Sequence, residues 1–335
     1  MIDTIRTAFD QTTAQSGSAA TWIRPYTDDA GPSDHQFVLF LKPEVTDVAN
    51  GLDLNAILGI VLEELDRWNV NIGAVRALNG DYLAEKRIMH AHYGVINQIS
   101  TQGYDAISEG AQAKLTSIYE KDLQRGATVL GAHQFLEAEP DFTAVALTSI
   151  NDSFGTEKLG GGTYALKLEV LSKPYIILNP FHPYQLVPYT TSGHGIIVIE
   201  GRSKTPWADL RSKLTGATNP THAEEGSIRN RLMVNADAIG LKSVGPGTNG
   251  VHLSAGALEG MVELTRFFSD DAKPVTFADT SFGRLLAQGP AAAAIDQLAE
   301  NTLLKIGGEN VSTFDLTEEL DAAEAAKKLE AGLAG

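Results

Sequence analysis

Three segments near the start of the chain restrict its fold more than any other feature. Residues 36–42, QFVLFLK, form an apolar run with β-branched and aromatic side chains, short enough for a buried central strand. Residues 54–68, LNAILGIVLEELDRW, repeat apolar side chains at intervals of three and four, which predicts an amphipathic helix. Residues 71–78, NIGAVRAL, predict a second strand. Strand, helix and strand in succession indicate an α/β protein, and both parallel and antiparallel pairing of the strands fit the pattern.

The later segments predict further elements of both kinds. Residues 1–35 are polar and predict an N-terminal extension with one short helix. Beyond residue 80 we expect a helical region to about 125, a hairpin or two strands at 163–179, strands at 194–201 and 274–278, and helices at 207–214, 258–268 and near the C-terminus. A mixed α/β (α+β) fold accommodates all of them.

Composition excludes several classes of partner. The chain has 335 residues, 43% of them hydrophobic, which is enough for one large core or two ordinary ones. A formal charge of −16 disfavours nucleic acid and anionic membrane surfaces, because both attract clustered Lys and Arg. The absence of cysteine excludes disulfides and thiolate chemistry. With neither a basic leader nor an apolar span in the sequence, we expect a cytoplasmic enzyme.

The stretch NGVHLSAGALEGMVELTRFF, residues 249–268, predicts a nucleophilic histidine. Glycines surround His252, Ser254 is placed to cap the helix that follows, and Glu263 lies eleven residues after the histidine. A helix start attracts anions, and a neutral imidazole can attack phosphorus when a second group holds its other nitrogen. Glu263 is the candidate for that group. The alternative is an ordinary capped helix whose loop holds one of eight histidines.

Cationic and hydroxyl side chains elsewhere predict phosphate contacts. Arg211, Thr218 and Arg229 lie in a region of small residues, and guanidinium groups match phosphate oxygens two at a time. Lys42 follows a predicted buried strand and precedes a proline, so its ammonium group should emerge at a strand end. Tyr93, next to His92, offers another donor. Each residue taken singly also fits ordinary surface solvation.

Three weaker motifs favour structural explanations. LGGGT at 159–163 lacks the Gly-Lys-Ser/Thr of a phosphate loop, so a hairpin turn fits it better. HLSAG places a histidine where a serine-hydrolase elbow requires glycine. His90 and His92 have no third ligand at zinc-site spacing, so no protein-bound metal is expected there.

The fragments KPE, HY, LVPYTTSG, GATNP, GSIR and NGVH, in this order from residue 42 to residue 252, resemble the nucleoside diphosphate kinase family. The resemblance implies a ferredoxin-like four-stranded antiparallel sheet with covering helices. It also implies transfer of the γ-phosphate of a nucleoside triphosphate to a nucleoside diphosphate, through a phosphohistidine in a ping-pong reaction, with Mg²⁺ carried by the nucleotide.

Residue roles carry over by motif. His252 would be the nucleophile, Glu263 would orient it, and Lys42 and Tyr93 would stand near the transferred group. Asn249 would hold the ribose hydroxyls together with Lys42. The remaining nucleotide contacts implied are Arg211, Thr218 and Arg229 for the phosphates and Phe181 for the base, with His182 as the alternative to Phe181 if the alignment is not shifted by one position.

Between Tyr93 and Phe181 lie 87 residues where the family has only a handful. The resemblance therefore divides the chain into an N-terminal extension (1–35), a kinase-like core (36–93 and 180–278) interrupted by an inserted subdomain (94–179), and a C-terminal helical extension (279–335). We expect a homo-oligomer. Two alternatives stay open: the same phosphohistidine chemistry on a non-standard acceptor, and a nucleotide-binding module without turnover.

Overall fold

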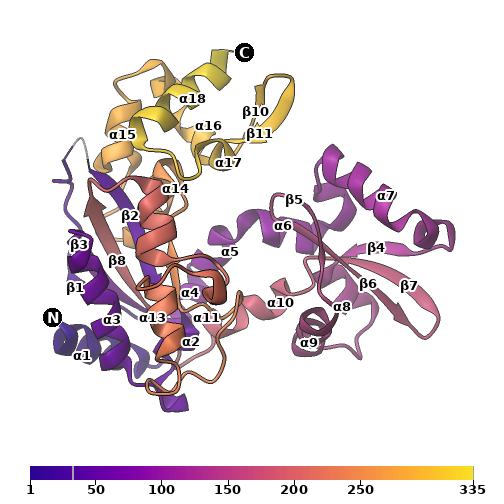
Figure 1. Ribbon diagram of the computed structural model, residues 1–335, viewed down its shortest axis with the longest axis horizontal. Coiled ribbons are helices and arrows are strands. Elements are labelled where there is room, and N and C mark those ends of the chain that lie inside the picture. The colour runs from indigo at the N-terminus through magenta and orange to yellow at the C-terminus, as the bar shows by residue number, and fades with distance from the viewer. Residues whose placement is uncertain (32–33, 335) are drawn as a thin grey trace. The chain divides into compact units, whose positions relative to one another are not determined.

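A computed structural model describes residues 1–31 and 34–334, and within it the chain divides into two units. The first unit contains Met1–Lys86 and the chain from Thr190 onward, and the second contains Arg87–Tyr189 (Figure 1). The fold is mixed α/β, with one fully antiparallel sheet in the first unit and a sheet of mixed pairing in the second. In the described residues, no helix combines the length and apolar character that crossing a membrane requires.

A five-stranded sheet forms the centre of the first unit, in the order β1-β3-β8-β2-β9 with every neighbouring pair antiparallel. Its strands are β1 (Ala20–Arg24), β2 (His35–Leu41), β3 (Asn71–Asn79), β8 (Gly195–Ser203) and β9 (Val251–Leu253). Antiparallel pairing resolves the choice that the opening segments left open. The sheet has one strand more than the four expected, because β1 comes from residues predicted as an extension with only a short helix.

Strand β2 is buried along its whole length, as its apolar run predicts. Phe37, Leu39 and Leu41 join the core that includes Ile57 of α3 (Leu54–Arg67). Alternate residues point to the other face. There the ring of Phe40 lies 5.3 Å from that of Phe267 on α14 (Ala257–Phe268), so β2 is covered on both sides.

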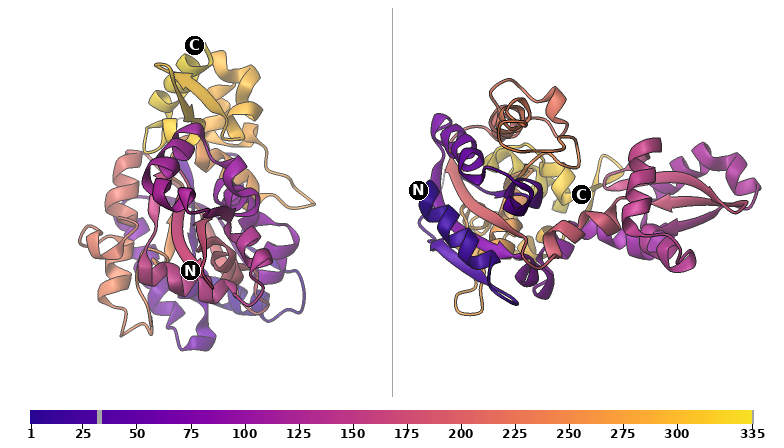
Figure 2. Two further views of the ribbon diagram at one scale, coloured as in Figure 1. Left: turned by 90° about the vertical axis from the view of Figure 1, so that its right-hand side faces the viewer. Right: turned by 90° about the horizontal axis from the view of Figure 1, so that it is seen from below.

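Helix α14 packs closely on β2 because it carries a glycine at the contact. A Cβ on Gly260 would lie 2.8 Å from the backbone oxygen of Gln36 and 3.4 Å from the Trp207 ring. Figure 2 shows the N-terminal helix α1 lying against the same sheet. The first unit's other helices are α1 (Ile2–Thr13), α2 (Pro43–Thr46), α4 (Gly80–Glu85), α12 (Trp207–Asp209), α13 (Ile228–Val234), α15 (Ser281–Leu286), α16 (Ile295–Ala299), α17 (Thr313–Thr317) and α18 (Ala322–Ala334), with a π-helical turn at Leu210–Thr215.

The second unit has a four-stranded sheet in the order β4-β7-β6-β5. Strands β6 and β7 form the hairpin predicted at 163–179, and β4 pairs with β7 in parallel. The elements are α5 (Ile88–His92), α6 (Gly94–Gln102), α7 (Glu109–Gln124), β4 (Thr128–Gly131), α8 (Ala132–Ala138), α9 (Ala144–Phe154), β5 (Glu157–Gly160), β6 (Thr163–Val170), β7 (Lys173–Leu178) and α10 (His182–Gln185), while α11 (Val187–Thr190) lies at the boundary between the units. The helical region predicted from 80 to 125 is confirmed.

One expectation near the C-terminus is wrong and another is incomplete. Residues 274–278 form no strand, because Val275 donates its N–H to the Ser269 hydroxyl and Thr276 donates its N–H to the Asp279 carboxylate. The region predicted as a helical extension also contains a hairpin of β10 (Leu303–Ile306) and β11 (Glu309–Ser312), turning at two glycines with φ of 60° and 93°. The terminal Ala/Glu/Lys helix is confirmed as α18.

Candidate functional site

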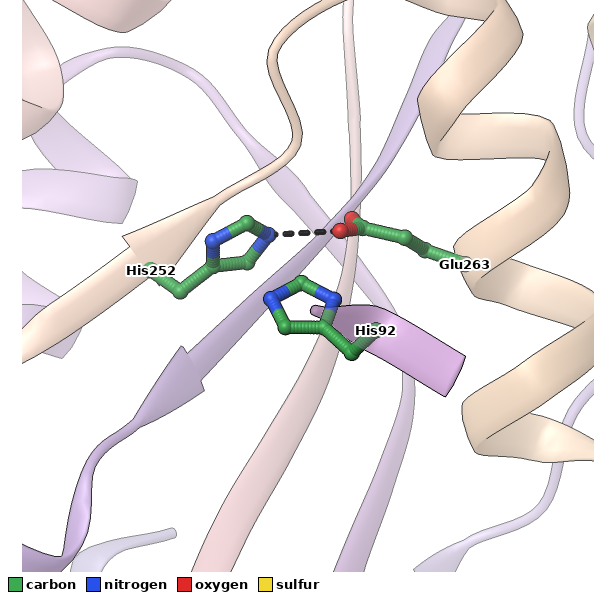
Figure 3. Close-up of side chains that lie close together, drawn as sticks. All are labelled: His92, His252 and Glu263. Atoms are coloured by element: carbon green, nitrogen blue, oxygen red, sulfur yellow. Dashed lines mark hydrogen bonds and ion pairs between the residues drawn. The ribbon is translucent and has the colours of Figure 1, made fainter. Parts of the chain in front are cut away.

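His252 lies on β9 directly opposite Phe40 of β2. Its imidazole stacks on the Phe40 ring, with the ring centroids 4.6 Å apart and the planes inclined by 21°. Nε2 of the imidazole is 2.8 Å from Oε1 of Glu263 (Figure 3). The strand, its neighbour and the helix therefore fix both the plane of the imidazole and the nitrogen that faces the carboxylate.

Glu263 is completely buried on α14, where hydrogen bonds hold its carboxylate. The Ser254 hydroxyl donates to Oε2 at 2.5 Å, and the same hydroxyl oxygen accepts the backbone N–H of Val38 at 2.9 Å. Ser254 was expected to cap the helix. That expectation is wrong, since the helix begins after Gly256 without a side-chain cap and the serine instead links Glu263 to β2.

A second carboxylate stands one helical turn before Glu263. Glu259 accepts the backbone N–H of Ala255 at 3.1 Å, in the segment joining β9 to α14. Burial, followed by repulsion from Glu263, raises the pKa of Glu259 to about 8. Arg266, further along the helix, lies near both carboxylates, and burial lowers its pKa. Helix α14 therefore carries three ionisable side chains close together, Glu259, Glu263 and Arg266, and one of them contacts His252.

Lys42 reaches the turn that leads into β9. Its Nζ donates to Oδ1 of Asn249 at 2.8 Å, and its backbone N–H donates to the Gly250 carbonyl at 2.9 Å. Burial lowers the pKa of Lys42, an effect that Glu44 opposes and Arg229 reinforces. Glu44 also accepts the Gly250 N–H at 3.0 Å. The strand-end lysine predicted from the sequence is thus held beside the turn that precedes His252.

Asn249 connects Lys42 to the loop that carries Thr218. The Asn249 amide donates to the carbonyl oxygens of Thr218 and Pro246, each at 3.0 Å. Asn249 is buried, so these bonds are shielded from water and fix the amide orientation. Segments more than 170 residues apart in the sequence, around Lys42 and around Thr218, are therefore joined through one side chain.

Arg229 is 7% exposed and lies next to β9. Its Nη1 donates to the Gly216 carbonyl at 2.8 Å and its Nη2 to the Val251 carbonyl at 2.9 Å. Burial, followed by repulsion from Arg211, lowers the pKa of Arg229 to about 10. The guanidinium group thus binds a carbonyl next to His252 in sequence while keeping a positive charge at neutral pH.

Arg211 contacts the residue that follows His252. Its Nη1 donates to the Leu253 carbonyl at 3.0 Å. A pocket of about 340 Å³ opens among these groups, lined by Arg211, Ser212, Gly216, Ala217, Thr218, His222, Glu224, Arg229 and Glu319. The three residues predicted to hold phosphates therefore share one pocket wall. Their neighbours include two carboxylates as well as His222.

Tyr93 and Phe181 belong to the second unit. The Tyr93 hydroxyl is 3.4 Å from that of Tyr189, and the Phe181 ring lies 5.6 Å from the Tyr164 ring in an edge-on arrangement. His182, the alternative to Phe181, is buried, with its ring nitrogens near Gln185 and Asn97. The roles of Tyr93 and Phe181 toward a nucleotide stay predictions.

Part of the sequence is similar to that of a known protein. No protein-family model matches the chain. A nucleoside diphosphate kinase from Methylobacterium sp. (strain 4-46) is 32% identical over 105 residues, which is 30% of this chain and 66% of that relative. Part of this chain is therefore similar in sequence to a nucleoside diphosphate kinase. It spans slightly less than two thirds of the length of the curated relative it matches.

Solved nucleoside diphosphate kinases are also similar, at low identity. The enzyme from Encephalitozoon cuniculi is 13% identical with a TM-score of 0.35, over 72% of this chain and 95% of that one. The enzyme from Pyrobaculum aerophilum is 19% identical with a TM-score of 0.32, over 71% of this chain and 97% of that one.

Several residues around the site were not singled out from the sequence of this chain. Phe40 and Glu44 flank Lys42, and strand pairing across β2 and β9 is what brings them to His252 and Gly250. Glu259 could have been found, since it lies one turn before Glu263 on the predicted helix. Glu319 contacts Arg211 from more than 100 residues away, and no local pattern indicates it.

Proposed function

We propose that this protein is a phosphotransferase that moves the γ-phosphate of a nucleoside triphosphate to a nucleoside diphosphate through a phosphohistidine at His252. The observation that carries the proposal is the 2.8 Å contact of the His252 imidazole with buried Glu263, in the unit whose pocket is lined by Arg211, Thr218 and Arg229. The match to a relative named nucleoside diphosphate kinase supports it.

The chemistry would proceed in two half-reactions. Because Nε2 faces Glu263, the carboxylate would accept its N–H and leave the lone pair on Nδ1 as the nucleophile. Nδ1 would attack the γ-phosphorus, the bond from phosphorus to the bridging oxygen would break, and the diphosphate would leave with that electron pair. The second diphosphate would then reverse these steps and regenerate the neutral imidazole.

Charge neutralisation would come from the surrounding cations. Arg211, Thr218 and Arg229 would bind the α- and β-phosphates, and Lys42 would act at the transferred group. A contact of Tyr93, in the second unit, with that group stays a prediction of the family resemblance. Mg²⁺ would enter on the phosphate oxygens and reduce their charge. Asn249 would bind ribose hydroxyls with Lys42. Stacking of Phe181, in the second unit, on the base stays a prediction of the family resemblance.

The fold supports a kinase-like core with added segments. The strand order β9-β2-β8-β3, with helix α3 between β2 and β3 and helix α13 before β9, supports a ferredoxin-like sheet whose edge β1 would extend. We propose that residues 36–93 and 180–278 form this core and that residues 94–179 are an insertion.

Labelling with γ-labelled ATP and Mg²⁺ tests the proposal. We expect acid-labile, alkali-stable label on the wild type and its loss in His252→Ala, with label retained in His194→Asn, a change at a half-exposed histidine in the first unit. Absence of label on the wild type would instead indicate a binding module without turnover. Label that nucleoside diphosphates cannot remove would indicate a different acceptor.

A further inference from the structure

A C-terminal segment, Thr317–Glu319, contacts the loop that follows His252. We call residues 252–256 the His252 loop. The backbone N–H of Glu319 donates to the Ala255 carbonyl at 2.9 Å. A Cβ on Gly256 would lie 2.6 Å from the Thr317 carbonyl oxygen, so only glycine fits there. Residues outside the expected kinase-like core therefore form part of the wall around this loop.

Two carboxylates of this segment ion-pair with Arg211. Glu318 Oε1 is 3.3 Å from Nη2 of Arg211, and Glu319 Oε1 is 3.7 Å from Nε. The remaining nitrogen, Nη1, donates to the Leu253 carbonyl. Nη1 and Nη2 of the guanidinium group thus have oxygen partners at 3.0 and 3.3 Å, while Nε lies only at ion-pair distance from Glu319. The two carboxylates balance the charge of Arg211 before any phosphate arrives.

Glu319 also lines the pocket that contains Arg211 and Arg229. Its backbone has a φ of 59°, in the left-handed region that non-glycine residues adopt uncommonly. The side chains of Glu318 and Glu319 are 48% and 49% exposed, so both carboxylates can return to water without a buried charge being created. They are therefore held in place but remain displaceable.

We propose that Glu318 and Glu319 act as an internal competitor that occupies Arg211 until a polyphosphate displaces it. The inference rests on the proposed function in one respect, the use of Arg211 as a phosphate ligand. A planar guanidinium group binds phosphate oxygens in the same paired manner as it binds carboxylates, so both anions compete for the same nitrogens. A carboxylate left on the pocket wall would also repel the incoming charge.

Titration calorimetry with inorganic tripolyphosphate, without Mg²⁺ or nucleotide, tests this. The variant Glu318→Gln/Glu319→Gln removes both charges and keeps the side-chain shapes. We expect it to bind tripolyphosphate about 3- to 10-fold more tightly than the wild type, on the order of the Coulomb effect of neighbouring charges near a surface. Glu324→Gln in α18, at an exposed residue, is the matched control and should leave the affinity unchanged.

An Arg211→Ala background separates competition at this guanidinium group from a general charge effect. There the two Gln substitutions should no longer tighten binding. The inference is overturned if the double Gln variant binds tripolyphosphate with equal or lower affinity, if its gain persists without Arg211, or if neither it nor the wild type binds. Glu319→Gly, which suits the left-handed backbone, repeats the test should the double variant fold poorly. Labelling of His252 does not enter this measurement, so the two proposals can fail separately.

Discussion

At the scale of single residues, the site depends on a buried carboxylate whose oxygens both have hydrogen-bond partners. Glu263 is fully buried, and both of its oxygens face hydrogen-bonding groups, Nε2 of His252 and Oγ of Ser254. An ionised group in such a place is tolerated only when its partners are fixed. The arrangement therefore holds the imidazole in one tautomer and one plane, which a nucleophile attacking phosphorus requires.

Glu263→Gln should separate the orientation of the His252 imidazole from the binding of ATP. The amide keeps the shape but replaces one acceptor oxygen with a donor, so it cannot serve both Nε2–H and the serine hydroxyl. We expect the rate of His252 phosphorylation to fall about 100-fold or more, by analogy with neutralising the carboxylate partner of other catalytic histidines, while ATP affinity changes little. Rapid-quench labelling and calorimetry measure the two quantities. An unchanged rate would remove Glu263 from the proposed mechanism.

Glu259 makes the stability of the first unit depend on pH. Its pKa rises from an ordinary 4.5 to about 8 on folding, so the folded state binds this proton more tightly than the unfolded state. The stabilisation is present below about pH 4.5 and is lost as pH rises through about 8. We expect Glu259→Gln to gain about 1–3 kcal/mol in free energy of unfolding relative to the wild type between pH 5 and pH 8. Urea titrations at both pH values measure this. The same difference in free energy of unfolding between variant and wild type at pH 5 and at pH 8 would contradict the prediction.

At the scale of elements, the position of α14 against β2 places Glu263 opposite His252. Gly260 lies in this contact, with no room for a side chain against the Gln36 carbonyl. The register of β9 with β2 then sets His252 opposite Phe40. One helix contact and one strand pairing together determine the 2.8 Å distance between the imidazole and the carboxylate.

Gly260→Ala tests the helix contact. Alanine favours a helix by about 1 kcal/mol over glycine, but overpacking against a backbone oxygen costs about 1–3 kcal/mol. Because the added Cβ would lie 2.8 Å from that oxygen, the steric cost should win and both stability and the rate of His252 labelling should fall. Gly59→Ala in α3, where nothing lies within 4 Å, is the control and should gain stability. Equal responses of the two variants in urea unfolding would refute this account.

The sequence predicts the elements whose apolar pattern is continuous or periodic. Strand β2 and helices α3 and α14 follow from their own residues, and helical spacing brings Glu263 toward the start of α14. Strand β1 was not predicted, because the strand has only five residues and they are partly exposed at the edge of the sheet. The β10–β11 hairpin carried a Gly-Gly signal between alternating residues that could have been used.

The candidate site was predictable only in part, because many of its contacts involve groups that leave no pattern in the sequence. The motif order gathered Lys42, Arg229, Asn249 and His252, but their actual partners are mostly backbone carbonyls. Arg229 binds the carbonyls of residues 216 and 251, and a carbonyl carries no side-chain signature in the sequence. Likewise, the pairing of Arg211 with Glu318 joins residues that only tertiary structure brings together.

At the scale of the whole molecule, the two units have separate hydrophobic cores. The main core contains residues of the sheet around β2 together with α3, α14 and the C-terminal helices. In the second unit, one cluster includes Leu115 and Ile176, and another includes Phe135 and Ile177. Units with their own cores can unfold in separate transitions.

We therefore expect calorimetric unfolding of the full chain to show two transitions. Tripolyphosphate should raise the midpoint of only one of them, because the pocket with Arg211, Thr218 and Arg229 lies wholly in the first unit and a ligand stabilises the state that binds it. At 100 times its dissociation constant the ligand would add about 2.7 kcal/mol to that unit alone. Gly260→Ala should lower the same transition and leave the other unchanged. A single transition that responds as a whole to both perturbations would show that the units fold as one cooperative body.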